Sequence, residues 1–164
     1  MNKQKLETMR KIKQEFDNLQ NDPILSLGCT VGLPDPKNVF KWNLSLIGPT
    51  DTPYAGGMFF LTVDFPDEYP RKRPEVRFTN KIYHLNVSNS NGHICISTLN
   101  DWEKNLARNI PPPPMVDVIS SIFALFYDQN PKSPYSGEMA REYESNRPLF
   151  DKKAREWTKK YAHM

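Results

Sequence analysis

A chain of 164 residues is long enough for one domain with its own core, and its two cysteines are too few for a disulfide framework. The net charge of +3 is mild and gives no support for nucleic-acid binding. No apolar run approaches the ~20 residues that cross a bilayer, and the charged N-terminus lacks the pattern of a secretory signal. We therefore expect a single domain over residues 1–164 in a reducing compartment, the cytoplasm or the nucleus, with no nucleic-acid or membrane partner.

Residues 3–20 have the pattern of an amphipathic helix. Four apolar residues recur three or four positions apart and so share one stripe: Met9, Ile12, Phe16 and Leu19. Basic residues lie on the opposite face, where they either solvate the helix or contact a partner. The sequence leaves both interpretations open. Asn21, Asp22 and Pro23 end the helix.

Four strand-like segments follow, at 27–33, 40–46, 58–65 and 75–78. Their short connections favour an antiparallel meander, because a parallel sheet would need crossover helices. In the first segment, Leu27, Cys29, Val31 and Leu33 alternate with small or polar residues, so we expect Cys29 on the buried face as a packing residue.

The chain then returns to helical patterns. Apolar residues between 118 and 126 predict a buried helix, a short helix is expected over 136–146, and Pro148 opens the last one. Residues 110–114 (IPPPP) predict a polyproline II segment, which is either a rigid approach to the next helix or a ligand for an aromatic groove. Together these elements predict an α+β fold with an N-terminal helix, a four-stranded antiparallel meander and three later helices.

The segment from Ile82 to Trp102 contains one of the two cysteines, Cys95, and two of the three histidines, His84 and His93. Its polar loop, residues 86–92, is rich in Asn and Ser. Such a loop lies at the surface because its polar groups need water or partners. We therefore expect Cys95 at an accessible edge, where a thiol is available for chemistry.

Four interpretations compete for Cys95. A zinc site with His84 and His93 lacks a fourth ligand. A cysteine hydrolase would use His93 as its base, although no protease signature surrounds the pair. A packed, inert cysteine is also compatible with the composition. In the fourth, the thiol accepts an acyl group from another thioester without metal or cofactor, and Asn86 is a candidate donor to the oxyanion of the later transfer step.

The same residues carry a resemblance to a known family. The matching segments, in order, are GPTDTPYAGGMFF, VDFPDEYP, KIYHLN, GHICISTLNDW and AREWTKKYA. From about residue 8 to the C-terminus, the chain resembles ubiquitin-conjugating enzymes. The resemblance implies that Cys95 is the thioester-forming cysteine and that Asn86 is the asparagine of the family's His-Pro-Asn motif. It also implies that His84 is the histidine of that motif, with a mainly structural role.

The resemblance implies an acyltransferase that receives ubiquitin from an activating enzyme and passes it to lysines of substrate proteins, usually with a ligase. ATP is consumed by the activating enzyme, so no cofactor or metal is expected here, and the family resemblance implies a monomer. Two alternatives stay open. In the first, the modifier is a ubiquitin-like protein instead of ubiquitin. In the second, the chain is a non-catalytic ubiquitin-binding variant.

The sequence departs from the family pattern around the cysteine. Leu85 stands where the motif has proline, and the loop from Asn86 to Cys95 is one residue longer than usual. Ser97 and Ser133 replace acidic residues that often flank the site in related enzymes, so we expect both to support the site without assisting lysine deprotonation.

The resemblance also assigns partner-binding positions. The ligase-binding positions correspond to Arg10, Arg71, Glu103, Lys104 and Asn105. Their side chains differ from the usual ones, and residues 108–114 look inserted, so we expect an unusual set of ligases. Thr30 matches the back-surface position that binds a second ubiquitin non-covalently.

Overall fold

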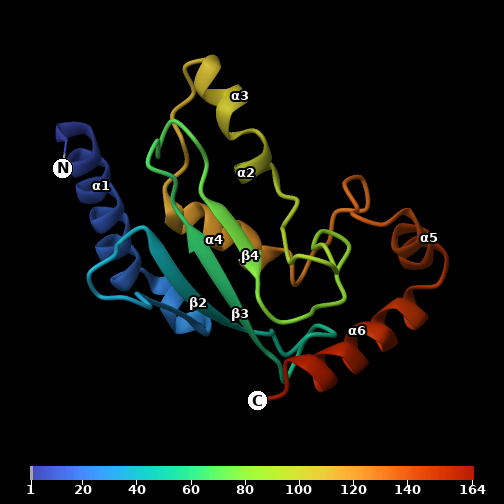
Figure 1. The fold of residues 1–164 in the computed structure, drawn as a ribbon. Coiled ribbons are helices and arrows are strands. Elements are labelled where there is room, and N and C mark those ends of the chain that lie inside the picture. The colour runs from blue at the N-terminus through green and yellow to red at the C-terminus, as the bar shows by residue number, and fades with distance from the viewer. Residues whose placement is uncertain (1) are drawn as a thin grey trace.

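The computed structural model describes residues 2–164 (Figure 1). In chain order the elements are α1 (Lys3–Gln20), a 3₁₀ turn η1 (Pro23–Leu27), β1 (Cys29–Gly32), β2 (Lys41–Ile47), β3 (Met58–Asp64), β4 (Glu75–Phe78), α2 (Ser97–Asn100), α3 (Trp102–Ala107), α4 (Met115–Ala124), α5 (Gly137–Ser145) and α6 (Arg147–Tyr161). The predicted order of helix, four-stranded meander and later helices is confirmed. Two short helices that the sequence did not predict, α2 and α3, precede the expected three. None of the helices described over residues 2–164 has the length and apolarity needed to cross a membrane.

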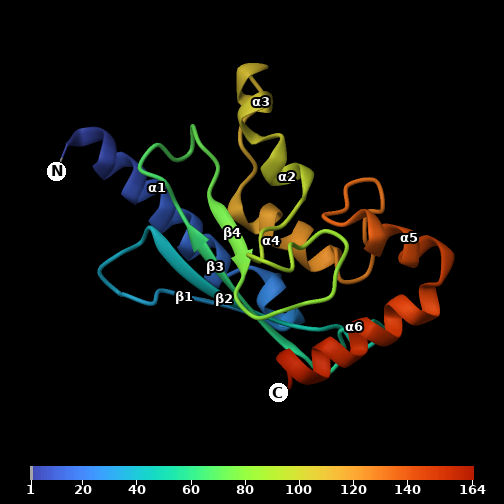
Figure 2. The same cartoon turned by 45° about the vertical axis from the view of Figure 1, so that its right-hand side comes forward.

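The four strands pair in sequence order, and each pair is antiparallel. Along β2, Trp42, Leu44 and Leu46 are buried, whereas the residues between them face outward. Helix α4 passes behind the sheet in both views, so the buried side chains form the core between the sheet and this helix (Figures 1 and 2).

The outer face of the sheet carries a row of residues in register. Thr30 of β1 pairs with Ser45 of β2, which pairs with Phe60 of β3. The Phe60 side chain is 49% exposed. This row (Thr30, Ser45 and Phe60) is called the outer sheet face below.

Helix α1 and Cys29 of β1 match their predicted faces, whereas Leu27, at the start of the predicted strand, ends η1 and is 58% exposed. Ile12 and Leu19 are fully buried, and the basic residues opposite them are exposed. Cys29 is 2% exposed, and burial raises the pKa of its thiol to about 11. The prediction that Cys29 is a packing residue is therefore confirmed.

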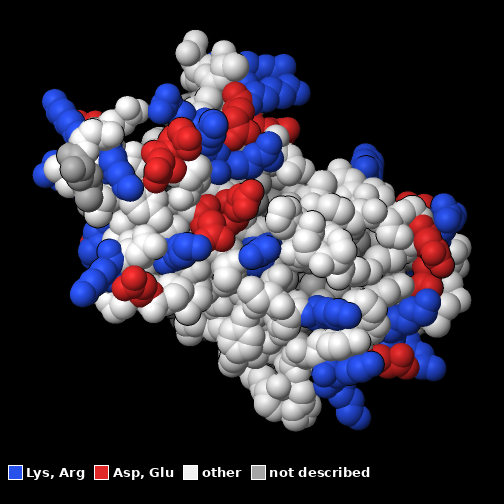
Figure 3. Space-filling model, viewed as in Figure 1, with Lys and Arg blue, Asp and Glu red and all other residues white. Residues whose placement is uncertain are grey.

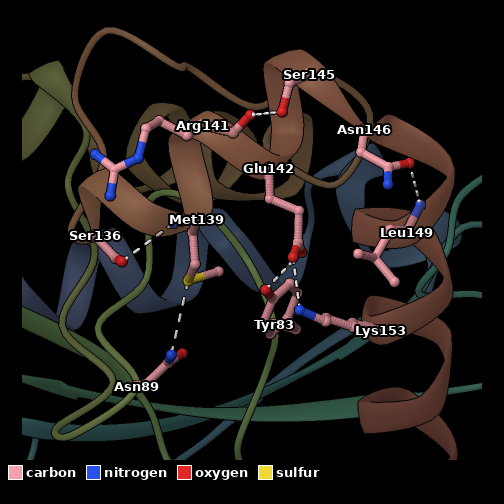
Figure 4. A network of polar contacts seen from close by, with 10 residues as sticks. All are labelled: Tyr83, Asn89, Ser136, Met139, Arg141, Glu142, Ser145, Asn146, Leu149 and Lys153. Carbon is pink, nitrogen blue, oxygen red and sulfur yellow. Dashed lines mark hydrogen bonds and ion pairs between the residues drawn. The ribbon is translucent and has the colours of Figure 1, made fainter.

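A polar network ties α5 and α6 to the segment that precedes the cysteine loop (Figure 4). Glu142 of α5 accepts hydrogen bonds from the hydroxyl of Tyr83 at 2.8 Å and from Nζ of Lys153 on α6 at 2.6 Å. Desolvation opposes ionisation of Glu142, but these two donors outweigh it and lower the pKa of the carboxyl. The network therefore links three segments through one carboxylate.

The proline segment leads directly into α4. Pro114 has φ −64° and ψ 154°, which is polyproline II geometry, and α4 begins at the next residue. The backbone N–H of Met115 donates to Oε2 of Glu15 on α1 at 2.7 Å. This geometry fits the interpretation of residues 110–114 as a rigid approach to the helix.

Candidate active site

Cys95 lies between an isolated bridge, Val87 to Ile94, and the start of α2. The segment 94–96 therefore contributes only a bridge and not a full strand. The Cys95 N–H donates to the carbonyl of Asn86 at 2.8 Å, and its Sγ accepts a hydrogen bond from Nδ2 of Asn100 at 3.1 Å. The residue is half-buried, so the sulfur is held in place without being sealed under packed side chains.

The loop between Asn86 and Cys95 closes like a hairpin. The N–H of Ser88 donates to the carbonyl of His93, and the N–H of Gly92 donates back to Ser88, both at 2.9 Å. Gly92 has φ +75°, and a Cβ there would lie 2.0 Å from the carbonyl oxygen of Phe78, so this turn requires glycine. The backbone hydrogen bond from Cys95 to Asn86 closes this loop, so its length does not separate the two residues.

The side chain of Asn86 is fully buried and fully hydrogen-bonded. Its Nδ2 donates to the carbonyls of Asn130 at 2.9 Å and Ser133 at 3.0 Å, and its Oδ1 accepts from the N–H of Asn130 at 2.8 Å. The amide thereby fixes residues 130–133 beside the cysteine loop. In this arrangement, donation to an oxyanion requires one amide hydrogen to leave a backbone carbonyl.

His84 is buried with both ring nitrogens engaged. Nδ1 accepts from the N–H of Asn86 at 3.0 Å, so Nε2 carries the proton and donates to the carbonyl of Leu125 at 2.8 Å. Burial lowers the pKa of His84 to about 4, although the bond to Leu125 opposes this shift. These contacts support the structural role that the resemblance implied.

The metal and hydrolase interpretations find no matching geometry. His84 has no free nitrogen for a ligand, and residues 2–164 contain no group of three His, Cys, Asp or Glu side chains that could hold a metal ion. His93 forms an isolated bridge with Arg77. Within the described part of the chain, no hydrogen bond joins the His93 ring to Cys95.

Leu85, at the position of the motif's proline, uses the N–H that proline lacks. This N–H donates to Oε1 of Gln129 at 2.9 Å, and Nε2 of Gln129 donates to the hydroxyl of Tyr54 at 2.8 Å. The Tyr54 hydroxyl in turn donates to the carbonyl of Tyr83 at 2.6 Å. A buried hydrogen-bond chain therefore holds the turn that proline would otherwise stiffen.

Two further candidate site residues, Ser97 and Ser133, were predicted from the sequence. Ser97 is exposed at the start of α2, and Ser133 is half-buried, with its carbonyl bonded to Asn86. Sequence reasoning missed Asn100 and Tyr135. Partial desolvation raises the pKa of Tyr135, and the nearby Cys95 raises it further. The only sequence signal for Asn100 was its place five residues after Cys95, a spacing that means proximity only if a helical turn intervenes.

A groove of about 760 Å³ opens beside the cysteine. Its lining includes Arg73, Val76, Ile94, Asn100, Glu103 and Tyr135. Lys, Arg, Asp and Glu side chains gather at the end of the molecule that carries the start of α1 and α3 and again over α5 and α6, whereas the area between these two ends is mostly uncharged (Figure 3). The groove is large enough for an extended peptide or a long side chain.

The predicted ligase-binding positions cluster at one end of the fold. The indole N–H of Trp102 donates to the carbonyl of Pro70 at 2.8 Å, and Arg73 binds Glu103 through both its backbone N–H at 2.8 Å and its Nε at 3.1 Å. These bonds join the loop containing Arg71 to α3. The start of α1 lies at the same end in both views (Figures 1 and 2).

Comparisons with known proteins identify the family of this fold. The family model for ubiquitin-conjugating enzymes matches residues 11–158. The chain belongs to the ubiquitin-conjugating enzyme family. It is similar to a solved structure of a Plasmodium yoelii protein assigned as a ubiquitin conjugating enzyme, with 31% identity over 96% of each chain and a TM-score of 0.80.

Proposed function

We propose that this protein carries ubiquitin or a related modifier as a thioester on Cys95 and transfers it to lysines of substrate proteins. The observation that carries the proposal is the half-buried Cys95, whose sulfur is held by Asn100 at the edge of a groove. Membership of the ubiquitin-conjugating enzyme family supports the same reaction.

Two acyl transfers make up the reaction. In loading, the Cys95 sulfur attacks the carbonyl of the activating enzyme's thioester, a new C–S bond forms, and the donor thiolate leaves. In discharge, a lysine nitrogen attacks the thioester on Cys95, a C–N bond forms, the C–S bond breaks, and the amine loses a proton to solvent. The activating enzyme consumes the ATP, so this chain needs no cofactor of its own in either step.

Asn86 contributes to the proposed reaction in two ways. Its three hydrogen bonds hold residues 130–133 beside Cys95, which shapes the surface that an incoming lysine meets. It also stabilises the oxyanion, which requires an amide hydrogen to leave a backbone carbonyl and donate to the substrate oxygen. Ser97 and Ser133 supply no carboxylate at this surface, so lysine must lose its proton without one from these two positions.

An adduct assay tests the proposed function. With an activating enzyme, ATP and modifier, the wild-type protein is expected to form an adduct that reductant removes, because a thioester exchanges with thiols. Cys95→Ser should form an adduct that survives reductant, and Cys95→Ala should form none. Cys29→Ala is the matched control and should load normally, since Cys29 is buried away from solvent.

Running ubiquitin and ubiquitin-like modifiers in parallel identifies the cargo. An adduct that persists in Cys95→Ala, or no adduct with any modifier, would contradict the proposal. The second result would instead favour a non-catalytic ubiquitin-binding variant of the fold.

We further propose two separate partner surfaces. The ligase surface consists of Arg10, Arg71, Glu103, Lys104 and Asn105. The outer sheet face, with Thr30 and the exposed Phe60, binds a second modifier non-covalently. In NMR titrations, a ligase domain is expected to shift resonances of the first set, and free ubiquitin those of the second. Resonance shifts outside both surfaces, or shifts of both surfaces with the same partner, would contradict this assignment.

A further inference from the structure

Asn100 is the side chain in direct contact with the reacting sulfur. Its Nδ2 lies 3.1 Å from Cys95 Sγ, and within residues 2–164 this is the only side-chain hydrogen bond to that atom. We propose that Asn100 is a catalytic residue whose amide donates a hydrogen bond to the oxyanion formed when the acyl group leaves Cys95. This inference rests on the proposed function, because it assigns a role within that reaction.

The backbone of Asn100 is held by a hydrogen bond and by buried neighbours. Asn100 ends α2, and its N–H donates to the carbonyl of Ile96 at 2.8 Å. Leu99 on one side is 4% exposed, and Trp102 on the other is 1% exposed and bonded to Pro70. Because its neighbours are anchored in the core, the amide is positioned before a substrate arrives, as an effective oxyanion donor must be.

The Asn100 amide also has unused hydrogen-bonding capacity. The residue is exposed, and the bond to Cys95 is the only hydrogen bond of its side chain among the described residues. By contrast, Asn86 is 0% exposed, and both of its amide hydrogens are bonded to backbone carbonyls. In this arrangement, the amide donor available to a substrate at Cys95 is therefore Asn100.

The chemistry of discharge places the oxyanion within reach. When a lysine nitrogen attacks the thioester carbon, the carbonyl electrons move onto its oxygen, which is two bonds away from Cys95 Sγ. A donor that already contacts the sulfur reaches this oxygen through a small side-chain rotation. As the carbonyl re-forms, the C–S bond breaks and its electrons return to sulfur, where the same N–H stabilises the leaving thiolate.

The test is single-turnover discharge of the preformed ubiquitin adduct to free lysine, without ligase or activating enzyme. For Asn100→Ala we expect the limiting rate to fall about tenfold, with little change in the lysine concentration for half-maximal rate. The loss is smaller than the roughly 10²–10³-fold found for a buried oxyanion donor, because this amide is exposed to solvent. Asn100→Gln, which keeps the donor, should recover part of the rate.

Asn100→Asp separates this role from a role at the amine. A carboxylate has no donor and repels an oxyanion, so its rate should be no higher than that of Asn100→Ala. Asn18→Ala, an exposed asparagine on α1, is the matched control and should discharge at the wild-type rate. Thermal melting of each variant checks that the fold is intact.

Two results would overturn the inference. One is discharge by Asn100→Ala at the wild-type rate. The other is faster discharge by Asn100→Asp than by Asn100→Ala, which would place the residue beside the amine. Failure of the proposed function itself is distinguishable, because the wild-type protein would then form no adduct to discharge.

Discussion

Replacement of Leu85 by proline is expected to lower the free energy of unfolding by about 3 kcal/mol, although it restores the residue of the family motif. Proline has no N–H, so Oε1 of Gln129 would lose its donor inside the protein, where Gln129 is only 7% exposed. The fully buried leucine side chain would also lose part of its packing. Urea denaturation of the two proteins measures the difference.

A double-mutant cycle shows whether the hydrogen bond is the cause. Leu85→Met retains the N–H and most of the volume, so it should lose less than about 1.5 kcal/mol. In a Gln129→Met background, Leu85→Pro should be less harmful, because no buried carbonyl is left without a donor. Equal losses in both backgrounds would mean that the Leu85–Gln129 bond contributes little.

The stability of the protein is expected to fall by about 3 kcal/mol as the pH decreases from 6.5 to about 4, because of His84. In the folded state its pKa is near 4, whereas the unfolded chain has the ordinary value of 6.5. Over this interval the unfolded state binds a proton that the folded state excludes. The contribution of neutral, buried His84 to stability is therefore fully present above pH 6.5, and it is lost as the pH falls toward the folded pKa.

Urea denaturation at a series of pH values tests this prediction. His84→Gln should be less stable at neutral pH but should lose the dependence on pH over this interval. His93→Gln is the matched control and should retain the dependence on pH, since His93 is only half-buried whereas His84 is buried. NMR titration of the His84 ring near its ordinary pKa of 6.5 in the folded protein would contradict the prediction.

Local patterns were enough to predict most of the fold. The period-2 run of β2 and the stripe of Ile12 and Leu19 on α1 are properties of adjacent residues, and each element formed where expected. Helices α2 and α3 were missed because the β-branched residues around Cys95 favour a strand. The helical turns there are stabilised by long-range burial of Leu99 and Trp102, which no local pattern encodes.

Part of the geometry of the candidate site was predictable for the same reason. Cys95 and its polar loop are contiguous in sequence, and the structure leaves Cys95 half-buried at the edge of a groove. The contacts of Leu85 with Gln129 and of Asn86 with Asn130 each span 44 positions. A single sequence gives no information on such pairs. The part that Leu85 plays in the turn therefore depends on a partner, Gln129, that its sequence neighbourhood does not reveal.

The buried amide of Asn86 has a consequence for how the chain matures. The sheet is complete by residue 78, but the wall beside the cysteine consists of residues 130–133, which are synthesised much later. A chain that ends before residue 130 therefore contains the sequence of all four strands but lacks the bond partners of the Asn86 amide. The strands and the residues that complete the surface beside Cys95 therefore come from different parts of the polypeptide.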